Sequence, residues 1–328
     1  MNYARTDAIR QGFTYGNAKP GTMAAIEIDG VTKRFGDVVA VRDLSLDVEE
    51  GEVFGFLGPN GAGKSTTINM LLDFVRPTEG EIRVLGRDVH DESVAMRQHL
   101  GVLPEGFSVY DRLTGRQHLE FAIESKGSDD DPDAILDRVG LDDAGDRKAG
   151  GYSKGMAQRL VLGMALVGDP DLLILDEPST GLDPNGARQM RDIVREEADR
   201  GATVFFSSHV LGQVEAVCDR VGILRDGELV AEDSIEGLRD ATSADTVLRI
   251  TADDVTEDAL ADVRALDGVS EVSESEETLR VSCESDVKTT VLSTLEDAGV
   301  DVRDFDTEEA SLEDLFVAYT TEGREVEA

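Results

Sequence analysis

The sequence has no tryptophan, only two cysteines and only eight prolines among its 328 residues. Cys218 and Cys283 have none of the short spacings that mark a metal-binding motif. Two isolated thiols favour a reducing compartment over a disulfide-stapled secreted fold. No stretch approaches the roughly 18 continuous apolar residues that a membrane-spanning helix needs. We therefore expect a folded cytoplasmic protein that does not itself cross a membrane.

Positive charge is also scarce. Lysine and arginine number 32 against 69 aspartates and glutamates, which gives a formal net charge of −37. Nucleic-acid binding requires a basic face that neutralises phosphates, so this composition argues against a nucleic-acid partner. Repulsion of this size is screened in molar salt, where the Debye length is about 3 Å. The composition is therefore typical of a cytoplasmic protein from a salt-accumulating, halophilic organism.

Residues 1–22 differ from the rest of the chain. They carry Arg5, Arg10 and Lys19 but no apolar core, so they do not have the pattern of a signal peptide. The first patterned segment begins at Met23. We expect residues 1–22 to be either a disordered extension or the product of a start codon assigned too far upstream.

Periodicity predicts an α/β domain over residues 23–238. Alternating residues predict antiparallel strands, whereas short apolar runs predict buried parallel strands separated by helices. Residues 106–165 are rich in helical patterns, with a polar, acidic interruption at 128–133, and Asp226-Gly227 predicts a type I′ hairpin turn. The expected antiparallel strands are 26–28, 38–41 and 44–48; the expected parallel strands are 53–57, 172–175 and 203–206; a helix is expected near 187–199.

A second, smaller domain is expected over residues 245–328, after a seam near 238–245. Its pattern is strand, helix, strand, strand, helix, strand, which is the ferredoxin-like α+β order. Ser311 and Asp314 can form a capping box on a last helix. Residues 240–328 contain 26 acidic and six basic side chains, so this domain carries over half of the excess negative charge.

A glycine-rich segment lies between a buried strand and an amphipathic helix that carries Ile68, Leu71, Leu72 and Val75 on one face and that we expect Pro77 to end. The segment, Gly58-Pro59-Asn60-Gly61-Ala62-Gly63-Lys64-Ser65, fits the phosphate-loop pattern. Its backbone N–H groups and the helix N-terminus favour phosphate. Lys64 can reach the β- and γ-phosphates, and the Ser65 hydroxyl can ligate Mg²⁺.

Two carboxylates follow the apolar run 172–175. Asp176 and Glu177 stand at the carboxyl end of that strand, where open α/β sheets bind ligands. Asp176 is placed to hold Mg²⁺, and Glu177 can act as a general base toward the attacking water. Two solvated loop acids are the alternative in so acidic a chain.

Further segments carry a resemblance to the ATP-binding-cassette ATPases over residues 24–238. Tyr152 to Arg159 resembles their signature segment, Asp176-Glu177-Pro178 their second nucleotide motif, and Ser179 to Pro184 their D-loop. Ser207-Ser208-His209 resembles their switch, and Phe35 is placed like the aromatic that stacks on adenine. The expected fold is therefore a P-loop cassette with a mixed sheet core, an antiparallel β subdomain and a helical subdomain near 106–165.

The resemblance implies a head-to-tail dimer, formed with a second copy or a related subunit, that encloses ATP and Mg²⁺. The signature residues Ser153, Lys154, Gly155 and Met156 would face the partner's nucleotide, and Asp183 would belong to the D-loop. His209 would bind the γ-phosphate and help to place the water. Thr66 and Glu105 complete the expected nucleotide-binding set, with Glu105 also a candidate metal ligand.

Two departures from that family stand out. The signature usually has two glycines and a glutamine after its serine, whereas this chain has Lys154, Gly155 and Met156. Glu105 stands where a glutamine is usual, and it adds negative charge beside the triphosphate. The alternative at that position is a loop carboxylate that takes no part in the site.

The end of the chain, residues 310–319, resembles the ATPases that serve ABC-2-type export and multidrug permeases. The expected function is therefore ATP hydrolysis at the cytoplasmic face of the membrane, powering export through a separate polytopic permease. A soluble ABC scaffold not coupled to transport is the alternative. A factor acting on the ribosome or on DNA is disfavoured by the single cassette and the negative charge.

Overall fold

The computed structural model describes residues 24–241, 246–253, 255–275, 278–283 and 287–308. The chain divides into two units, with the division between Ser234 and Ile235. The expected extension over residues 1–22 and the capping box of Ser311 and Asp314 lie outside the described residues.

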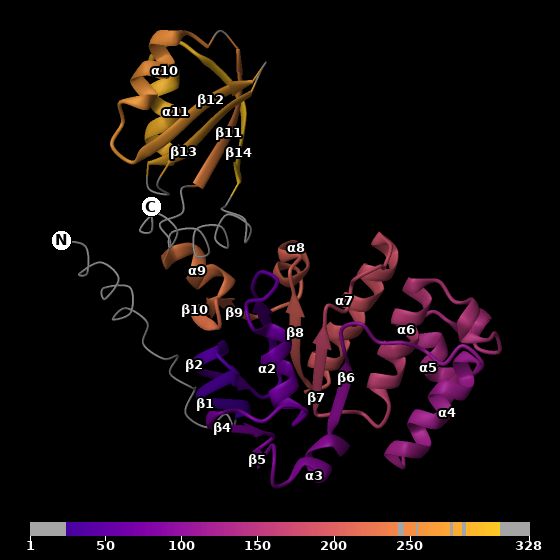
Figure 1. Ribbon diagram of the computed structural model, residues 1–328. Coiled ribbons are helices and arrows are strands. Elements are labelled where there is room, and N and C mark those ends of the chain that lie inside the picture. The colour runs from indigo at the N-terminus through magenta and orange to yellow at the C-terminus, as the bar shows by residue number, and fades with distance from the viewer. Residues whose placement is uncertain (1–23, 242–245, 254, 276–277, 284–286, 309–328) are drawn as a thin grey trace. The chain divides into compact units, whose positions relative to one another are not determined.

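A six-stranded sheet in the order β10-β9-β3-β8-β7-β6 forms the centre of the first unit (Figure 1). Five strands are parallel, and β10 pairs antiparallel with β9. Every residue of β3, β7 and β8 is buried, as expected for apolar strands covered on both faces. The strands are β3 (Val53–Leu57), β6 (Leu100–Leu103), β7 (Leu172–Asp176), β8 (Thr203–Ser208), β9 (Arg220–Arg225) and β10 (Glu228–Ser234).

This strand order collects the sequence motifs at one edge. β8 pairs with β3 on one side and with β7 on the other, although the three are far apart in the chain. Because the strands are parallel, their carboxyl ends meet at the same edge. The phosphate loop follows β3, Asp176 ends β7 and His209 follows β8, while Glu105 comes two residues after β6. The topology therefore places every predicted chemical motif of the core along this edge.

An antiparallel sheet, ordered β2-β1-β4-β5, forms a second layer in this unit. The expected strands 38–41 and 44–48 are one continuous strand, β2, which accommodates Asp43 at a φ of 45°. β2 pairs with β1 through several register shifts, so the irregularity bends the pair without ending it. The elements are β1 (Ala24–Phe35), β2 (Val38–Glu49), β4 (Glu79–Val84), β5 (Arg87–Asp88) and α3 (Ser93–Gln98).

The helix after the phosphate loop is shorter than the sequence predicts. α2 spans Lys64–Leu71, and Asp73 adopts a φ of 54° directly afterwards. The N–H groups of Phe74 and Val75 both donate to the carbonyl of Asn69. A left-handed residue with such backward bonds ends a helix, so the helix stops before Val75 and well before Pro77.

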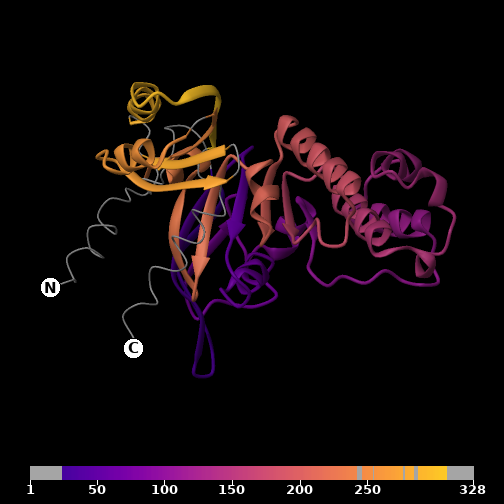
Figure 2. The same cartoon turned by 90° about the horizontal axis from the view of Figure 1, so that it is seen from above.

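The helical subdomain contains α4 (Gly115–Lys126), α5 (Pro132–Arg138) and α6 (Lys154–Leu166), which lie to one side of the sheet in both Figure 1 and Figure 2. Thr114 forms a capping box with Gln117 at the start of α4. Asp131 caps α5, so the acidic interruption expected over 128–133 is shorter than predicted.

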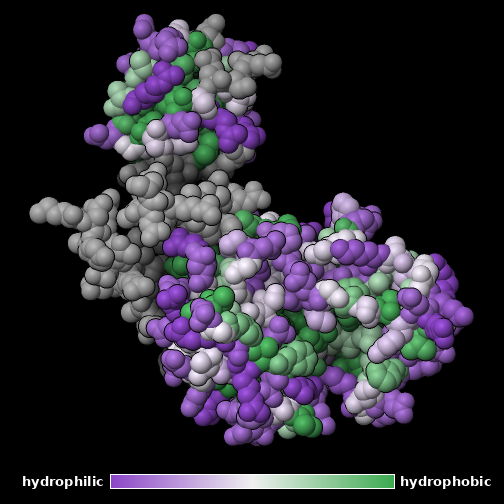
Figure 3. All heavy atoms as spheres, in the orientation of Figure 1, coloured by the Kyte–Doolittle hydropathy of each residue, from purple (hydrophilic) through white to green (hydrophobic). Residues whose placement is uncertain are grey.

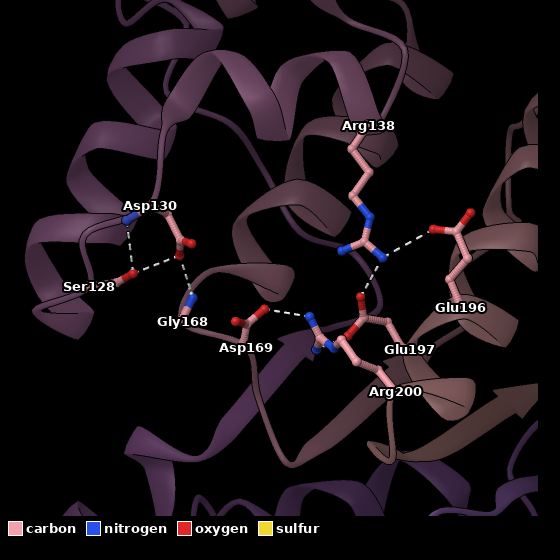
Figure 4. A network of polar contacts seen from close by, with 8 residues as sticks. All are labelled: Ser128, Asp130, Arg138, Gly168, Asp169, Glu196, Glu197 and Arg200. Atoms are coloured by element: carbon pink, nitrogen blue, oxygen red, sulfur yellow. Dashed lines mark hydrogen bonds and ion pairs between the residues drawn. The ribbon is translucent and has the colours of Figure 1, made fainter.

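An ion network around one buried carboxylate joins this subdomain to the core helix α7 (Pro184–Asp199) (Figure 4). The Glu197 side chain is fully buried, and its Oε1 lies 2.6 Å from Nη2 of Arg138 on α5. Arg200 pairs with the other oxygen of Glu197 and with Asp169. A buried carboxylate needs such partners, because an unpaired buried charge is strongly destabilising.

The second unit contains a four-stranded antiparallel sheet in the order β12-β13-β11-β14. This order confirms the ferredoxin-like prediction, because the first and third strands are central. Leu248, Ile250, Leu279 and Val281 pack in one core with Val291 and Leu295. The elements are α9 (Ile235–Ala241), β11 (Thr246–Asp253), α10 (Glu257–Arg264), β12 (Val269–Ser275), β13 (Thr278–Cys283), α11 (Lys288–Asp297) and β14 (Asp301–Glu308).

Hydrophilic side chains cover most of the face of the first unit seen in Figure 3, with scattered apolar patches between them. Within the described part of the chain, no helix has the length and apolar character that a bilayer crossing demands.

Candidate active site

The phosphate loop, residues 58–63, crosses from β3 to α2 at the shared edge of the sheet. Gly63 has a φ of 109°, and a Cβ there would come 2.6 Å from the carbonyl oxygen of Ala40. A Cβ at Gly58 would come 2.5 Å from the carbonyl oxygen of Leu224. Both positions therefore require glycine, because the loop lies against neighbouring backbone.

Lys64 is the buried cation of this edge. Its side chain folds over the loop, and Nζ donates to the Gly58 carbonyl oxygen at 2.6 Å. Burial lowers the pKa of Lys64, whereas the negative charges of Glu177, Asp176 and Glu105 raise it, in that order of size. These three carboxylates thus act on one ammonium group, which places Lys64 electrostatically among the predicted site residues.

Asp176 ends β7 and is 5% exposed. Its pKa is raised to about 6, primarily by burial. The Ser207 hydroxyl and Lys64 lower the pKa, whereas Glu105 and Glu177 raise it. The edge therefore holds more negative charge than Lys64 neutralises, and a bound cation would be stabilised there.

Glu177 and His209 form the closest contact between two predicted catalytic side chains. Nδ1 of His209 lies 2.7 Å from Oε2 of Glu177. The Glu177 side chain is 8% exposed and the His209 side chain 55% exposed. Because an ionised carboxylate can only accept, this hydrogen bond requires a proton on Nδ1 of His209. Nε2 is left for another partner.

The backbone of Glu177 is fixed in an uncommon conformation. Its φ is 50°, in the left-handed region that a non-glycine residue seldom adopts. The Glu177 N–H donates to the Ser207 carbonyl oxygen at 3.0 Å, and Thr180 N donates back to the Glu177 carbonyl oxygen at 3.2 Å. The neighbouring strand therefore holds the turn that aims this carboxylate.

Gln158 supports the same turn and was not predicted as a site residue. It is 3% exposed, and Nε2 donates to the Pro178 carbonyl oxygen at 2.9 Å. Gln158 lies on α6 within the signature segment, so that segment is tied to the residue next to Glu177. A buried amide in an otherwise apolar helix face was the available signal in the sequence.

The signature segment forms the start of α6. Ser153 is the N-cap residue, and its Oγ accepts from Met156 N at 3.2 Å. Asp183 likewise caps α7 and accepts from Gly186 N at 2.9 Å. A Cβ on Gly155 would lie 3.2 Å from the Gly181 carbonyl oxygen, so the two helix starts are packed together.

A cavity of about 430 Å³ separates the loop after β6 from the start of α6. Glu105, Asp176 and Glu177 line it, together with Lys154 and Gln158. Glu105 and Lys154, which depart from the family pattern, therefore line the same cavity as Asp176 and Glu177.

The other predicted residues lie around this centre. Ser65 and Thr66 occupy the first turn of α2, with Ser65 exposed. Phe35 ends β1, where its ring is half exposed and 4.9 Å from the Lys33 ammonium. The structure therefore brings Lys64, Asp176, Glu177 and His209 together, and it places Phe35 on the antiparallel sheet.

The residues at this edge fit a magnesium ion that takes some of its ligands from the protein and others from bound phosphates. In the described part of the chain, no three His, Cys, Asp or Glu side chains form a complete metal centre. Mg²⁺ ordinarily uses one or two carboxylates and completes its shell with water and phosphate oxygens. The Ser65 hydroxyl and the Asp176 carboxylate are ligands of the right kind, and the surplus of carboxylates favours a cation.

A glycine phosphate loop, a buried acidic strand end and a carboxylate–histidine pair at one sheet edge define a P-loop ATPase. A family model described as "ABC transporter" matches residues 41–180. A second, described as the C-terminal domain of ATP-binding proteins like DrrA1-3, matches residues 234–320.

Two relatives match nearly the whole chain. The linearmycin resistance ATP-binding protein LnrL of Bacillus subtilis is 31% identical over 304 residues, covering 90% of this chain and 98% of the relative. The daunorubicin/doxorubicin resistance ATP-binding protein DrrA of Streptomyces peucetius is 36% identical over 305 residues, covering 90% and 92%. The chain therefore belongs to the ATP-binding proteins of ABC transporters, with a DrrA-type C-terminal domain.

A solved ATP-binding subunit of an ABC transporter supports the same fold. It superposes with a TM-score of 0.62 at 28% identity, covering 66% of this chain and 93% of that subunit. The predicted fold class and the predicted ATPase activity of a transporter subunit are thus confirmed, and transport is favoured over the soluble scaffold.

Proposed function

We propose that this chain hydrolyses ATP in a dimer of ATPase subunits at the cytoplasmic face of the membrane and drives export through a separate polytopic permease. The observation that carries the chemistry is the hydrogen bond between His209 and Glu177, at the edge that also holds Lys64 and Asp176. The match to resistance proteins over nearly the whole chain supports export as the direction of transport.

Glu177 is the general base in this proposal. Its carboxylate faces away from bulk solvent and is oriented by His209 and by the turn at the end of β7. A positioned base of this kind contributes roughly 10²–10⁴ in rate. In the ATP complex a doubly protonated His209 would donate Nδ1–H to Glu177 and Nε2–H to a γ-phosphate oxygen, so one ring would position both the base and the phosphate that the activated water attacks.

The phosphate loop supplies binding. Backbone N–H groups of residues 58–63 and the start of α2 would surround the β- and γ-phosphates, and Lys64 would exchange its Gly58 contact for phosphate oxygens. Ser65 and Asp176 would hold Mg²⁺, with Glu105 as a further candidate ligand, and Thr66 would contribute to nucleotide binding. The ion, when bound, neutralises charge that develops on the phosphates.

The dimer completes the site. Ser153 and Gly155 lie at the start of α6, a helix terminus that favours anions, and would contact the γ-phosphate held by the partner. Met156 and Asp183 would lie at the same interface. Phe35, which is half exposed, would stack on the adenine ring. The partner subunit is either a second copy of this chain or a related ATPase.

The cargo class follows from the relatives rather than from the ATPase. The two relatives are named for resistance to linearmycin and to daunorubicin, and we propose that the cargo here is likewise a toxic small molecule. Its recognition would belong to the permease.

Co-purification with a polytopic membrane protein encoded by a neighbouring gene would test this proposal. ATPase activity in the reconstituted complex should be magnesium-dependent and should rise with the exported compound. The Glu177→Gln complex serves as the inactive control. A chain that hydrolyses ATP but pairs only with soluble assembly proteins would contradict the transport assignment and support the scaffold.

A further inference from the structure

Lys154 makes a contact with Gly181 that its membership of the signature segment does not explain. It is the first residue of α6, directly after Ser153. Its aliphatic stem lies on Gly181: a Cβ placed at Gly181 would come 2.6 Å from Cδ, 2.9 Å from Cγ and 3.0 Å from Cε of Lys154. The stem therefore fills the space that a side chain at position 181 would need.

A second contact joins the same two segments. A Cβ on Gly155 would lie 3.2 Å from the Gly181 carbonyl oxygen and 3.6 Å from Cδ2 of Leu182. Gly181 has a φ of 83°, in the left-handed region that suits glycine. The start of α6 and the segment 180–183 are thus packed together within one subunit.

Lys154 also lines the 430 Å³ cavity described above. Four carboxylates line that cavity, those of Glu105, Asp111, Asp176 and Glu177, and Lys154 is the one basic residue among its lining residues. Lys154 therefore contributes the positive charge of a lining that is otherwise acidic.

We propose that Lys154 is a positioning residue that acts inside its own subunit. Its stem fixes the start of α6 on the D-loop at Gly181, and its ammonium balances the carboxylates of Glu105 and Glu177 across the cavity. The proposal rests on the proposed function, since it concerns how the signature and D-loop are presented to the partner's ATP. A direct contact of Lys154 with ATP is the competing role.

Substitutions at position 154 separate the contribution of the aliphatic stem from that of the positive charge. Lys154→Met keeps the stem, Lys154→Arg keeps the charge, and Lys154→Gly removes both. We expect Lys154→Met to lower kcat about three- to tenfold with KM for ATP within twofold of the parent, and Lys154→Arg to retain most of kcat. Lys154→Gly should be the slowest. A tenfold rise in KM at unchanged kcat in Lys154→Met would assign Lys154 to nucleotide contact and overturn the proposal.

The charge component has its own test. If Lys154 offsets the charge of Glu105, the ratio of kcat between the parent and Lys154→Met should be at least threefold smaller when both chains also carry Glu105→Gln. Equal losses in the two backgrounds would remove the electrostatic half of the proposal.

The steric component is tested by Gly181→Ala, with Gly127→Ala as the matched control. Gly127 ends α4 at a φ of 67° with nothing within 4 Å of its would-be Cβ, so this control reports the backbone cost alone. We expect Gly181→Ala to lower the Tm more than Gly127→Ala does. The double variant Gly181→Ala/Lys154→Gly should recover part of that loss, and no recovery would contradict the packing of the stem on Gly181.

The two kinds of failure can be told apart. A parent chain without ATPase activity, or a Glu177→Gln chain that does not dimerise with ATP, would overturn the proposed function. The Tm series at positions 154 and 181 needs neither activity nor dimer, so it judges the Lys154–Gly181 contact in either case.

Discussion

Nδ1 of His209 lies 2.7 Å from Oε2 of Glu177, although the two residues come from different strand ends. β7 and β8 are neighbours in the sheet, and their pairing sets this distance. The proposed base and the ring that orients it therefore follow two fully buried, directly paired strands, which would limit reorganisation during the proposed reaction.

Glu177→Gln should abolish turnover while preserving ATP binding. The amide is isosteric with the carboxylate but does not accept a proton, so kcat should fall by about 10²–10⁴. The variant should accumulate as an ATP-bound dimer in size-exclusion chromatography with ATP and Mg²⁺. His209→Ala should lower kcat as well, and combining both changes should cost little more than the worse single change. Parent-level hydrolysis by Glu177→Gln would show that Glu177 is not the base.

Asp176 should make the stability of the nucleotide-free protein fall as pH rises. Its pKa is raised from 3.8 to about 6 in the folded state, so ionisation is disfavoured there. The associated stability is present below pH 4 and is lost as pH passes through about 6. Asp176→Asn avoids this loss and should exceed the parent near pH 7.5 by on the order of 2–3 kcal/mol, from the size of the shift.

Urea denaturation from pH 5 to pH 8 measures this difference. The gap between Asp176→Asn and the parent should widen through pH 6. Asp192→Asn, on the exposed side of α7, removes one negative charge elsewhere and serves as the control. A gap that stays constant over this range would contradict the role of Asp176.

Local patterns predicted the parallel strands β3, β7 and β8, the phosphate loop and the residues at these strand ends, but they did not predict β4, β5 or β6. Continuous apolar runs such as 53–57 fix a buried parallel strand, and parallel pairing then brings their carboxyl ends together. The helix after the phosphate loop was predicted too long, because apolar spacing does not report that Asp73 turns left-handed. Local sequence patterns also could not predict contacts between distant segments, such as those of Gln158 with Pro178 and of Lys154 with Gly181.

The same limit applies to the Glu197 network. Glu197 and Arg138 are far apart in the chain, and each alone has the appearance of a solvated helix charge. Only the tertiary fold buries Glu197 and brings Arg138 of α5 to one of its oxygens, while Arg200 contacts the other.

Arg138→Gln should destabilise the protein by about 3 kcal/mol, because it leaves the buried Glu197 carboxylate with one partner fewer. Arg116→Gln is the matched control in the same subdomain, since its ion pairs with Asp133 and Asp146 are solvent-exposed, and it should change stability little. The double variant Arg138→Met/Glu197→Met should lie much closer to the parent, because it removes the charge together with its partner. Chemical denaturation measures all three, and equal effects of Arg138→Gln and Arg116→Gln would contradict the network's role.

The net charge of −37 should make stability depend on salt. Like charges repel in dilute buffer, and molar KCl shortens the screening length to about 3 Å. We expect Tm to rise markedly between 0.1 and 2 M KCl, since stability gained from screening grows with the excess charge. Sucrose at matched osmolality controls for solute exclusion, which strengthens folding without screening. Neutralising the exposed acids Asp262, Glu296 and Asp297 of the second unit to Asn and Gln should flatten the response of that unit. Equal Tm at both salt concentrations would remove the inference of adaptation to high salt.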